Sequence, residues 1–71
     1  MELTNDEKIN IINSHIKNLV YNKYNVELSL IEENSKPSPD EKNVNTLNEQ
    51  ISQFNLQFIA LQAEATKLTS I

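Results

Sequence analysis

The second half of the chain carries an unbroken heptad pattern of apolar residues. Steps of three and four residues alternate through Val44, Leu47, Ile51, Phe54, Phe58, Leu61, Ala65 and Leu68. These steps place the side chains at the a and d positions of a heptad, along the side of a helix that packs lengthwise on another helix. We therefore predict a long helix here and call these eight residues the seam.

The first half of the chain has a broader apolar arc. One line continues a heptad-like pattern through Ile9, Ile12, Ile16, Leu19, Val26 and Leu30, with Lys23 at a position where an apolar residue is expected. A second line lies beside it and contains Val20, Tyr24, Leu28 and Ile31. The arc is wider than packing on a single partner helix requires. Residues 26–30 also alternate as a strand would, but a lone strand has nothing to pair with, so we predict helix throughout.

Two capping boxes mark where the helices are expected to begin. Thr4 and Glu7 form the first, and Ser38 and Glu41 form the second, with Pro39 at the first helical position. Residues that precede proline avoid helical geometry, which places the turn at about residues 35–38. The helices then run from about residue 5 to 34 and from about residue 39 to 69.

So short a connection folds the two helices back on each other. The chain, residues 1–71, is expected to be one all-α domain, an antiparallel two-helix hairpin that resembles a coiled coil. A turn near residue 37 brings Lys23 and Tyr24 close to Ile51. Lys23 has two interpretations: an interior ion pair with Glu27, or a stem packed in the seam whose ammonium reaches water.

The predicted second helix has an additional apolar line on its b, c and f positions. A lone hairpin would expose these residues to water, so they are either scattered surface residues or a contact surface for further helices. We favour the contact surface, because the spacing is helical and the first half of the chain also has a surplus apolar line. A chain of 71 residues without Cys also points to oligomerisation as its source of stability. The hairpin is expected to dimerise into a four-helix bundle or a larger oligomer. Besides the seam, the expected interface residues are Leu56, Ile59, Ala60, Ala63, Ile12, Ile16, Leu19, Val20, Tyr24, Leu28 and Ile31.

The amino-acid composition argues against most kinds of catalytic, cofactor-binding and metal-binding site. The chain has no Gly, no Cys and one His, which removes phosphate-binding glycine loops, thiolate nucleophiles and multi-histidine metal sites. His15 is interpreted as a boundary residue, and Glu32 and Glu33 as a solvated helix end. We therefore predict no catalytic residue, no cofactor and no metal, and expect that the protein is not an enzyme.

Charge and hydropathy limit the classes of binding partner that we expect. The net charge is −4, with six scattered Lys and no Arg, which disfavours direct binding to nucleic acid. No apolar run approaches the length of about 20 residues that crosses a bilayer. The start of the chain is acidic and lacks the features of a signal peptide. These features predict a soluble cytoplasmic protein without a membrane partner.

Two resemblances bear on origin. The stretch from Asn22 to Asn34, the Pro/Ser turn and the run from Leu47 to Ile51 resemble short helical-hairpin proteins of marine phages, cyanophages among them. This resemblance implies a viral origin, hence a host-cell cytoplasm, and implies no activity. In architecture the chain also resembles the hairpin repressor-of-primer proteins, which dimerise into four-helix bundles and bind RNA through basic residues. This chain departs from them because it has no Arg.

These observations favour a non-enzymatic helical interaction protein that binds itself, with a helix of a host or virion protein as a further candidate partner. It would be a small viral or accessory factor. Two alternatives stay open: a nucleic-acid-binding bundle of the repressor-of-primer kind, and a structural component of a virion or larger assembly.

Overall fold

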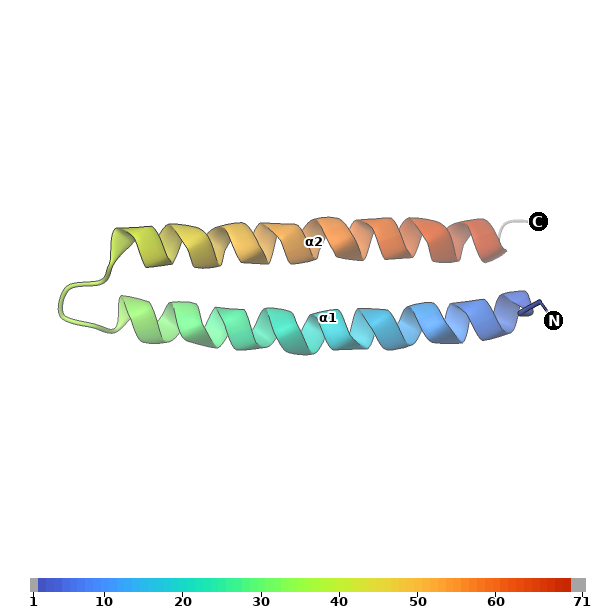
Figure 1. Cartoon of the computed structure of the whole chain (residues 1–71), viewed down its shortest axis with the longest axis horizontal. Coiled ribbons are helices and arrows are strands. Elements are labelled where there is room, and N and C mark those ends of the chain that lie inside the picture. The colour runs from blue at the N-terminus through green and yellow to red at the C-terminus, as the bar shows by residue number, and fades with distance from the viewer. Residues whose placement is uncertain (1, 70–71) are drawn as a thin grey trace.

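Two long helices account for nearly all of the chain that the structure describes. The computed structural model describes residues 2–69 and contains α1, Asn5–Asn34, and α2, Glu41–Thr69. The helices lie side by side and run in opposite directions, forming a rod of 55 × 17 × 15 Å (Figure 1). The predicted all-α helical hairpin is confirmed, and residues 26–30 are helical rather than extended.

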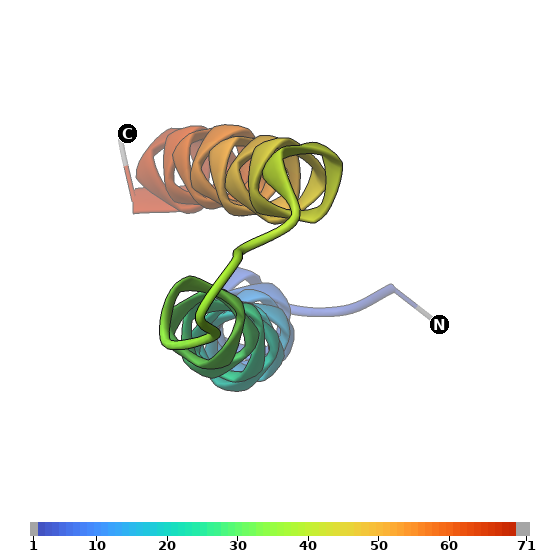
Figure 2. The same cartoon turned by 90° about the vertical axis from the view of Figure 1, so that its left-hand side faces the viewer.

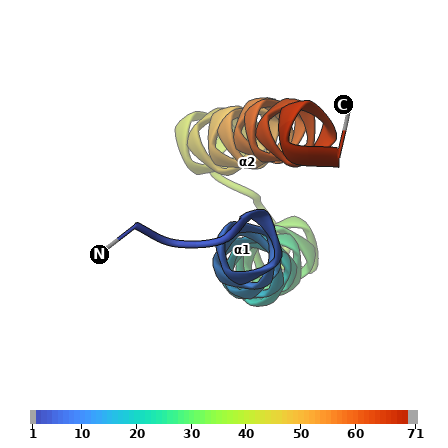
Figure 3. The same ribbon diagram turned by 90° about the vertical axis from the view of Figure 1, so that its right-hand side faces the viewer.

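The helix axes are slightly inclined to each other. Seen from the connection, α2 drifts to one side with depth while α1 drifts to the other (Figure 2), and the view from the opposite end shows the same crossing (Figure 3). A small crossing angle lets two straight helices keep heptad side chains in contact over many turns. The seam residues can therefore contact α1 along most of the length of the rod.

α1 begins with the predicted capping box. The Glu7 backbone N–H donates to the Thr4 hydroxyl at 3.1 Å, and the Thr4 backbone N–H donates to the Glu7 carboxylate at 2.9 Å. Thr4 itself is extended, with φ −70° and ψ 162°. Two of the N–H groups that a helix start leaves without partners are thus satisfied by residues three apart in sequence.

α1 ends without a residue in the left-handed conformation. The Ser35 N–H donates to the carbonyls of Ile31 at 3.0 Å and Glu32 at 3.3 Å, and the Ser35 hydroxyl donates to Glu32 O at 2.7 Å. No residue from 2 to 69 has a positive φ. Pro37 then stops further helix, because the residue before a proline avoids helical geometry. The chain therefore turns without glycine.

α2 begins two residues later than the sequence predicted. The helix starts at Glu41, and Asp40 rather than Ser38 is its N-cap: the Lys42 N–H donates to the Asp40 carboxylate at 2.9 Å. The predicted second capping box, with Pro39 as first helical residue, is therefore wrong. Asp is as good a cap as Ser, and the Asp40 N–H has an additional partner in the Glu33 carboxylate, at 3.2 Å.

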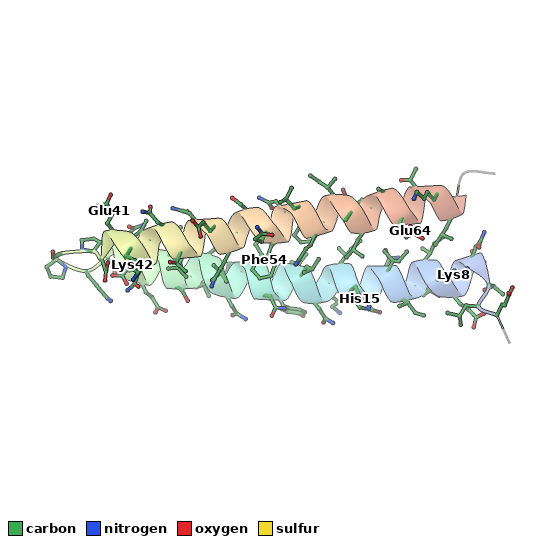
Figure 4. All side chains as sticks on the ribbon, turned by 45° about the horizontal axis from the view of Figure 1, so that its top comes forward. Lys8, His15, Glu41, Lys42, Phe54 and Glu64 are labelled. Carbon is green, nitrogen blue, oxygen red and sulfur yellow. The ribbon has the colours of Figure 1, made fainter. Side chains whose placement is uncertain are left out.

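The seam lies between the helices. All eight seam residues of α2 are half-buried, and Figure 4 shows Phe54 pointing from α2 into the space beside α1. On α1 the matching line runs through Ile9, Ile12, Ile16, Leu19, Lys23, Val26, Leu30 and Glu33. Within residues 2–69, Ile12 is the only apolar side chain that is buried. Two helices alone cover the edges of their contact poorly, because each seam residue touches only one partner helix.

A hydrogen bond closes the open end of the hairpin. The Asn5 side-chain amide donates to the carbonyl of Leu68 at 3.2 Å. Carbonyl groups in the last turn of a helix have no partner within that helix. The first turn of α1 therefore satisfies the last turn of α2, and residues 2 and 69 lie at the same end of the rod (Figure 1).

Candidate functional site

The second apolar lines of both helices are exposed. Ile31 and Ile59 are each 63% exposed, Leu56 and Tyr24 each 60%, and Val20 53%. The remaining members are also exposed: Leu28, Ala60 and Ala63. Of the residues expected at the interface, the structure places the seam and Ile12, Ile16 and Leu19 between α1 and α2. It leaves the second lines uncovered.

The α2 line faces away from α1. Leu56 and Ala63 occupy f positions, opposite the seam, and Ile59 and Ala60 occupy the neighbouring b and c positions. A side chain at f is the farthest from the packed partner helix. These four residues form what we call the outer strip of α2.

The two flanks of the hairpin differ in chemistry. One flank holds a groove of about 340 Å³ lined by His15, Asn18, Leu19, Gln57, Ala60 and Leu61. His15 and Gln57 both occupy g positions, so the g positions of the two helices meet on this side. We call it the groove flank. It continues towards the open end as a second hollow of about 240 Å³ that includes Ile11 and Glu64.

The e positions must then meet on the opposite flank. Val20 of α1 and Asn55 of α2 are e residues, and Tyr24, Ile31 and Ile59 occupy the adjacent b positions. We call this side, defined by these five residues, the apolar flank. Four of its five members are large apolar side chains that are more than half exposed. The apolar flank and the outer strip share Ile59 and are therefore continuous.

Of the two interpretations of Lys23, the ion pair with Glu27 is not formed, whereas a packed stem with an outward ammonium agrees with the contact that the residue makes. Its ammonium donates to the Asn55 side-chain oxygen at 2.9 Å and lies 5.9 Å from the centre of the Phe58 ring. The residue is half-buried, and it makes no ion pair with Glu27. From the sequence, Lys23 was expected to lie near Ile51. Asn55 lies about one helical turn, and Phe58 about two turns, further along α2 than Ile51. Helical side chains lean towards the N-terminus of their own helix, so Lys23 reaches towards higher residue numbers of α2.

A buried carboxylate ties the connection together. Glu33 is only 6% exposed, and its carboxylate accepts hydrogen bonds from the Asn43 amide at 3.1 Å and the Asp40 N–H at 3.2 Å. The Lys36 ammonium forms an ion pair with it at 3.2 Å. Interpreting Glu33 as part of a solvated helix end was wrong; Glu32 is exposed. The missed signal was spacing, because Glu33 continues the steps of three and four that pass through Val26 and Leu30.

The contacts of Glu33 lower its pKa. The Asn43 amide contributes most, followed by the Asp40 N–H and Lys36, and together they outweigh the desolvation of the carboxylate, which would raise the pKa. The pKa of Glu7 is likewise lowered by its hydrogen bonds to Thr4, the backbone N–H first. A carboxylate near the N-terminus of α2 also faces the positive end of the helix dipole. Glu33 therefore acts as an anionic cap for a helix to which it does not belong.

Two kinds of site, metal-binding clusters and membrane-crossing helices, are absent among residues 2–69. From residue 2 to 69, no group of three or more acidic or histidine side chains is placed to hold a metal ion. Neither helix, within that range, holds an apolar stretch suited to crossing a bilayer. Lys8 and Lys42 lie at opposite ends of the rod (Figure 4), and Lys23 and Lys36 are engaged with Asn55 and Glu33. These four lysines therefore form no single basic patch.

Comparison with known proteins adds no identity to this geometry. No protein-family model, no curated protein and no solved structure matches the chain.

Proposed function

We propose that this chain is a non-enzymatic helical interaction protein that packs its exposed apolar faces against other helices. Its first partner is a second copy of itself, and two hairpins form a four-helix bundle. One observation carries the proposal: nine large apolar side chains of the described residues are exposed, whereas one apolar side chain is buried. A small protein with so little core is stabilised when a partner covers those faces.

The exposed area supports the same proposal. The chain exposes 5644 Å². A compact monomer of 8.1 kDa exposes about 4,500 Å², so the hairpin presents an excess of about 1,100 Å². A standard protein interface covers about 800 Å² on each partner. The surplus area is therefore sufficient for a stable contact with one further hairpin.

The test is sedimentation velocity over a wide concentration range, on the wild-type chain and on a variant with Leu56→Glu and Ile59→Lys. We expect a dimeric or larger mass for the wild type. The variant should bind itself at least about tenfold more weakly, because the apolar side chain of Ile59, on the face that the second hairpin covers, becomes a charge that must be desolvated.

The matched control is Gln50→Glu with Gln53→Lys. It introduces the same charges at the same spacing on exposed polar positions of α2. The control should keep the wild-type mass. A monomeric wild type, or an unchanged mass in the Leu56 and Ile59 variant, would refute the proposal.

The outer strip of α2 supports a second candidate, a structural component of a larger assembly. Leu56 and Ala63 face away from α1 and Ala60 borders the groove flank, so a dimer formed on the apolar flank leaves all three uncovered. Two small residues in this strip allow another helix to approach closely. Electron microscopy of concentrated protein should then show ordered particles or filaments, and Leu56→Glu should abolish them. Dispersed dimers at high concentration would exclude this candidate.

A further inference from the structure

We propose that the second copy packs on the apolar flank with its long axis reversed. The two hairpins are related by a two-fold axis that crosses the rod at the level of the Lys23–Asn55 hydrogen bond. This inference rests on the proposed self-association and specifies its geometry. It places α1 of one copy on α1 of the other, and α2 on α2.

The level of the axis follows from the side chains on the apolar flank. The Glu33–Asn43 hydrogen bond of 3.1 Å sets the register of the helices, and counting back along α1 and forward along α2 from it brings residue 22 level with residue 54, next to Asn55. When two copies of α1 run antiparallel about an axis at residue 22, residues at equal distances from that point face each other. Val20 and Tyr24 are each two residues away, so Val20 of one copy packs on Tyr24 of the other. Both side chains, 53% and 60% exposed, are covered by this contact.

The same axis pairs opposite charges. Lys17 and Glu27 lie five residues before and after residue 22, on b and e positions of the apolar flank. Lys17 of each copy therefore faces Glu27 of the other, and the dimer contains this pair twice. In the described part of the hairpin the single ion pair joins Lys36 and Glu33, so Lys17 and Glu27 are both available. Complementary charges of this kind determine orientation more than affinity.

α2 contributes a contact at the axis itself. Asn55 lies at the level of the axis, so the two copies of this residue face each other. Its side-chain oxygen already accepts from Lys23, so its amide N–H groups are the donors that it can offer to the partner's amide. An amide pair at a fixed point sets the register, as buried Asn residues do in coiled coils.

The parallel arrangement of the two hairpins is less favourable. It would place α1 of one copy on α2 of the other at equal heights. Four residues beyond Lys23, Glu27 would face the neutral Asn48 and Ser52. Lys17 would face the apolar Ile59 and the neutral Gln62. Both charges would then be covered without an opposite charge, which costs free energy. The reversed arrangement avoids this cost.

Cysteine cross-linking tests the flank, and the chain has no cysteine of its own. Asn55→Cys places a thiol on the apolar flank, and Gln57→Cys, two residues away, places one on the groove flank. Under mild oxidation we expect Asn55→Cys to form disulfide-linked dimers at least about tenfold faster than Gln57→Cys, because only facing thiols have a high local concentration. Circular dichroism confirms that each variant is helical.

A charge exchange tests the orientation without touching Asn55. Lys17→Glu and Glu27→Lys should each raise the dimer Kd roughly tenfold, because each turns two attractive pairs into two repulsive ones. Combining them should restore the wild-type Kd. Glu32→Lys, on the groove flank, is the matched control and should leave the Kd unchanged.

The outcomes separate the two proposals. A wild type that is monomeric at all concentrations refutes self-association itself. A dimer in which Gln57→Cys cross-links faster, or in which the combined charge exchange does not restore binding, retains the proposed function and refutes this geometry.

Discussion

Two polar residues stand where a seam of apolar side chains would be expected, and both are satisfied from the other helix. Glu33 accepts from Asn43 and from the Asp40 N–H, and Lys23 donates to Asn55. A charge placed between helices costs desolvation unless it is paired, so such residues contribute more to register than to stability. Together these contacts, at two levels along the rod, fix the register of α2 relative to α1.

Glu33 makes the stability of the hairpin sensitive to acid. Because the pKa of Glu33 in the fold lies below its ordinary value of 4.5, its contribution is fully present above that pH and is lost as the pH falls through the lowered pKa. The thermal midpoint of the wild type should therefore fall as the pH is lowered below about 4.5. Glu33→Gln should lower the midpoint at pH 7 and flatten this dependence.

The matched control is Glu32→Gln, which removes the same charge from an exposed neighbour. It should keep the acid-dependent fall of the wild type. Circular dichroism melts between pH 3 and pH 7 (a range about the ordinary carboxyl pKa) make the comparison. An equally steep fall in Glu33→Gln would show that other carboxylates carry it.

At the scale of the helices, the N-termini of α1 and α2 are capped in different ways. α1 is capped by a residue that belongs to its own local sequence, Thr4, with Glu7 completing the box. α2 is capped by Asp40 and, from the other helix, by Glu33. The start of α1 can therefore form before the hairpin closes, whereas part of the capping of α2 depends on closure.

Thr4→Ala should destabilise the protein by about 1 kcal/mol, because it removes the acceptor for the Glu7 N–H at the start of α1. Thr46→Ala is the matched control. Thr46 lies inside α2 and its hydroxyl donates to the Lys42 carbonyl, a bond without a capping role. The control should change stability by less than about 0.5 kcal/mol. Urea unfolding followed by circular dichroism measures both, and equal losses would contradict the capping role of Thr4.

The difference between local and long-range contacts explains which features of the structure could be predicted from the sequence. Heptad spacing and the Thr4 box are local patterns, and both appear as expected. The start of α2 and the burial of Glu33 depend on a contact between Glu33 and Asn43, ten residues apart across the turn. No local pattern encodes that contact. Residue spacing alone also did not predict that Lys23 reaches Asn55, because this depends on the lean of side chains along an antiparallel pair.

At the scale of the whole molecule, the hairpin has a surface larger than its mass requires and a core of one buried apolar residue among those described. In the proposed dimer, stability is tied to association, because a partner that binds only the folded form shifts the folding equilibrium. The exposed apolar faces would then contribute to the stability of the fold only when a partner covers them.

The thermal midpoint should rise with protein concentration, by about 5 °C for each tenfold increase, if unfolding is coupled to dissociation of a dimer. Melts recorded by circular dichroism over a hundredfold concentration range, in cells of different path length, measure this slope. The Leu56 and Ile59 double variant serves as the reference without association. A midpoint that is constant for the wild type would mean that the isolated hairpin carries its own stability.

Residues 2 and 69 leave the rod at one tip, and the connection forms the other. In the reversed dimer proposed above, the tips that carry the chain ends point in opposite directions, separated by roughly the 55 Å length of one rod. Any cargo fused to the chain would be held at two distant places, and the dimer would act as a spacer. In a parallel dimer all four ends would meet, and the same cargo would be gathered into a cluster. The orientation of two hairpins thus decides between bridging and clustering.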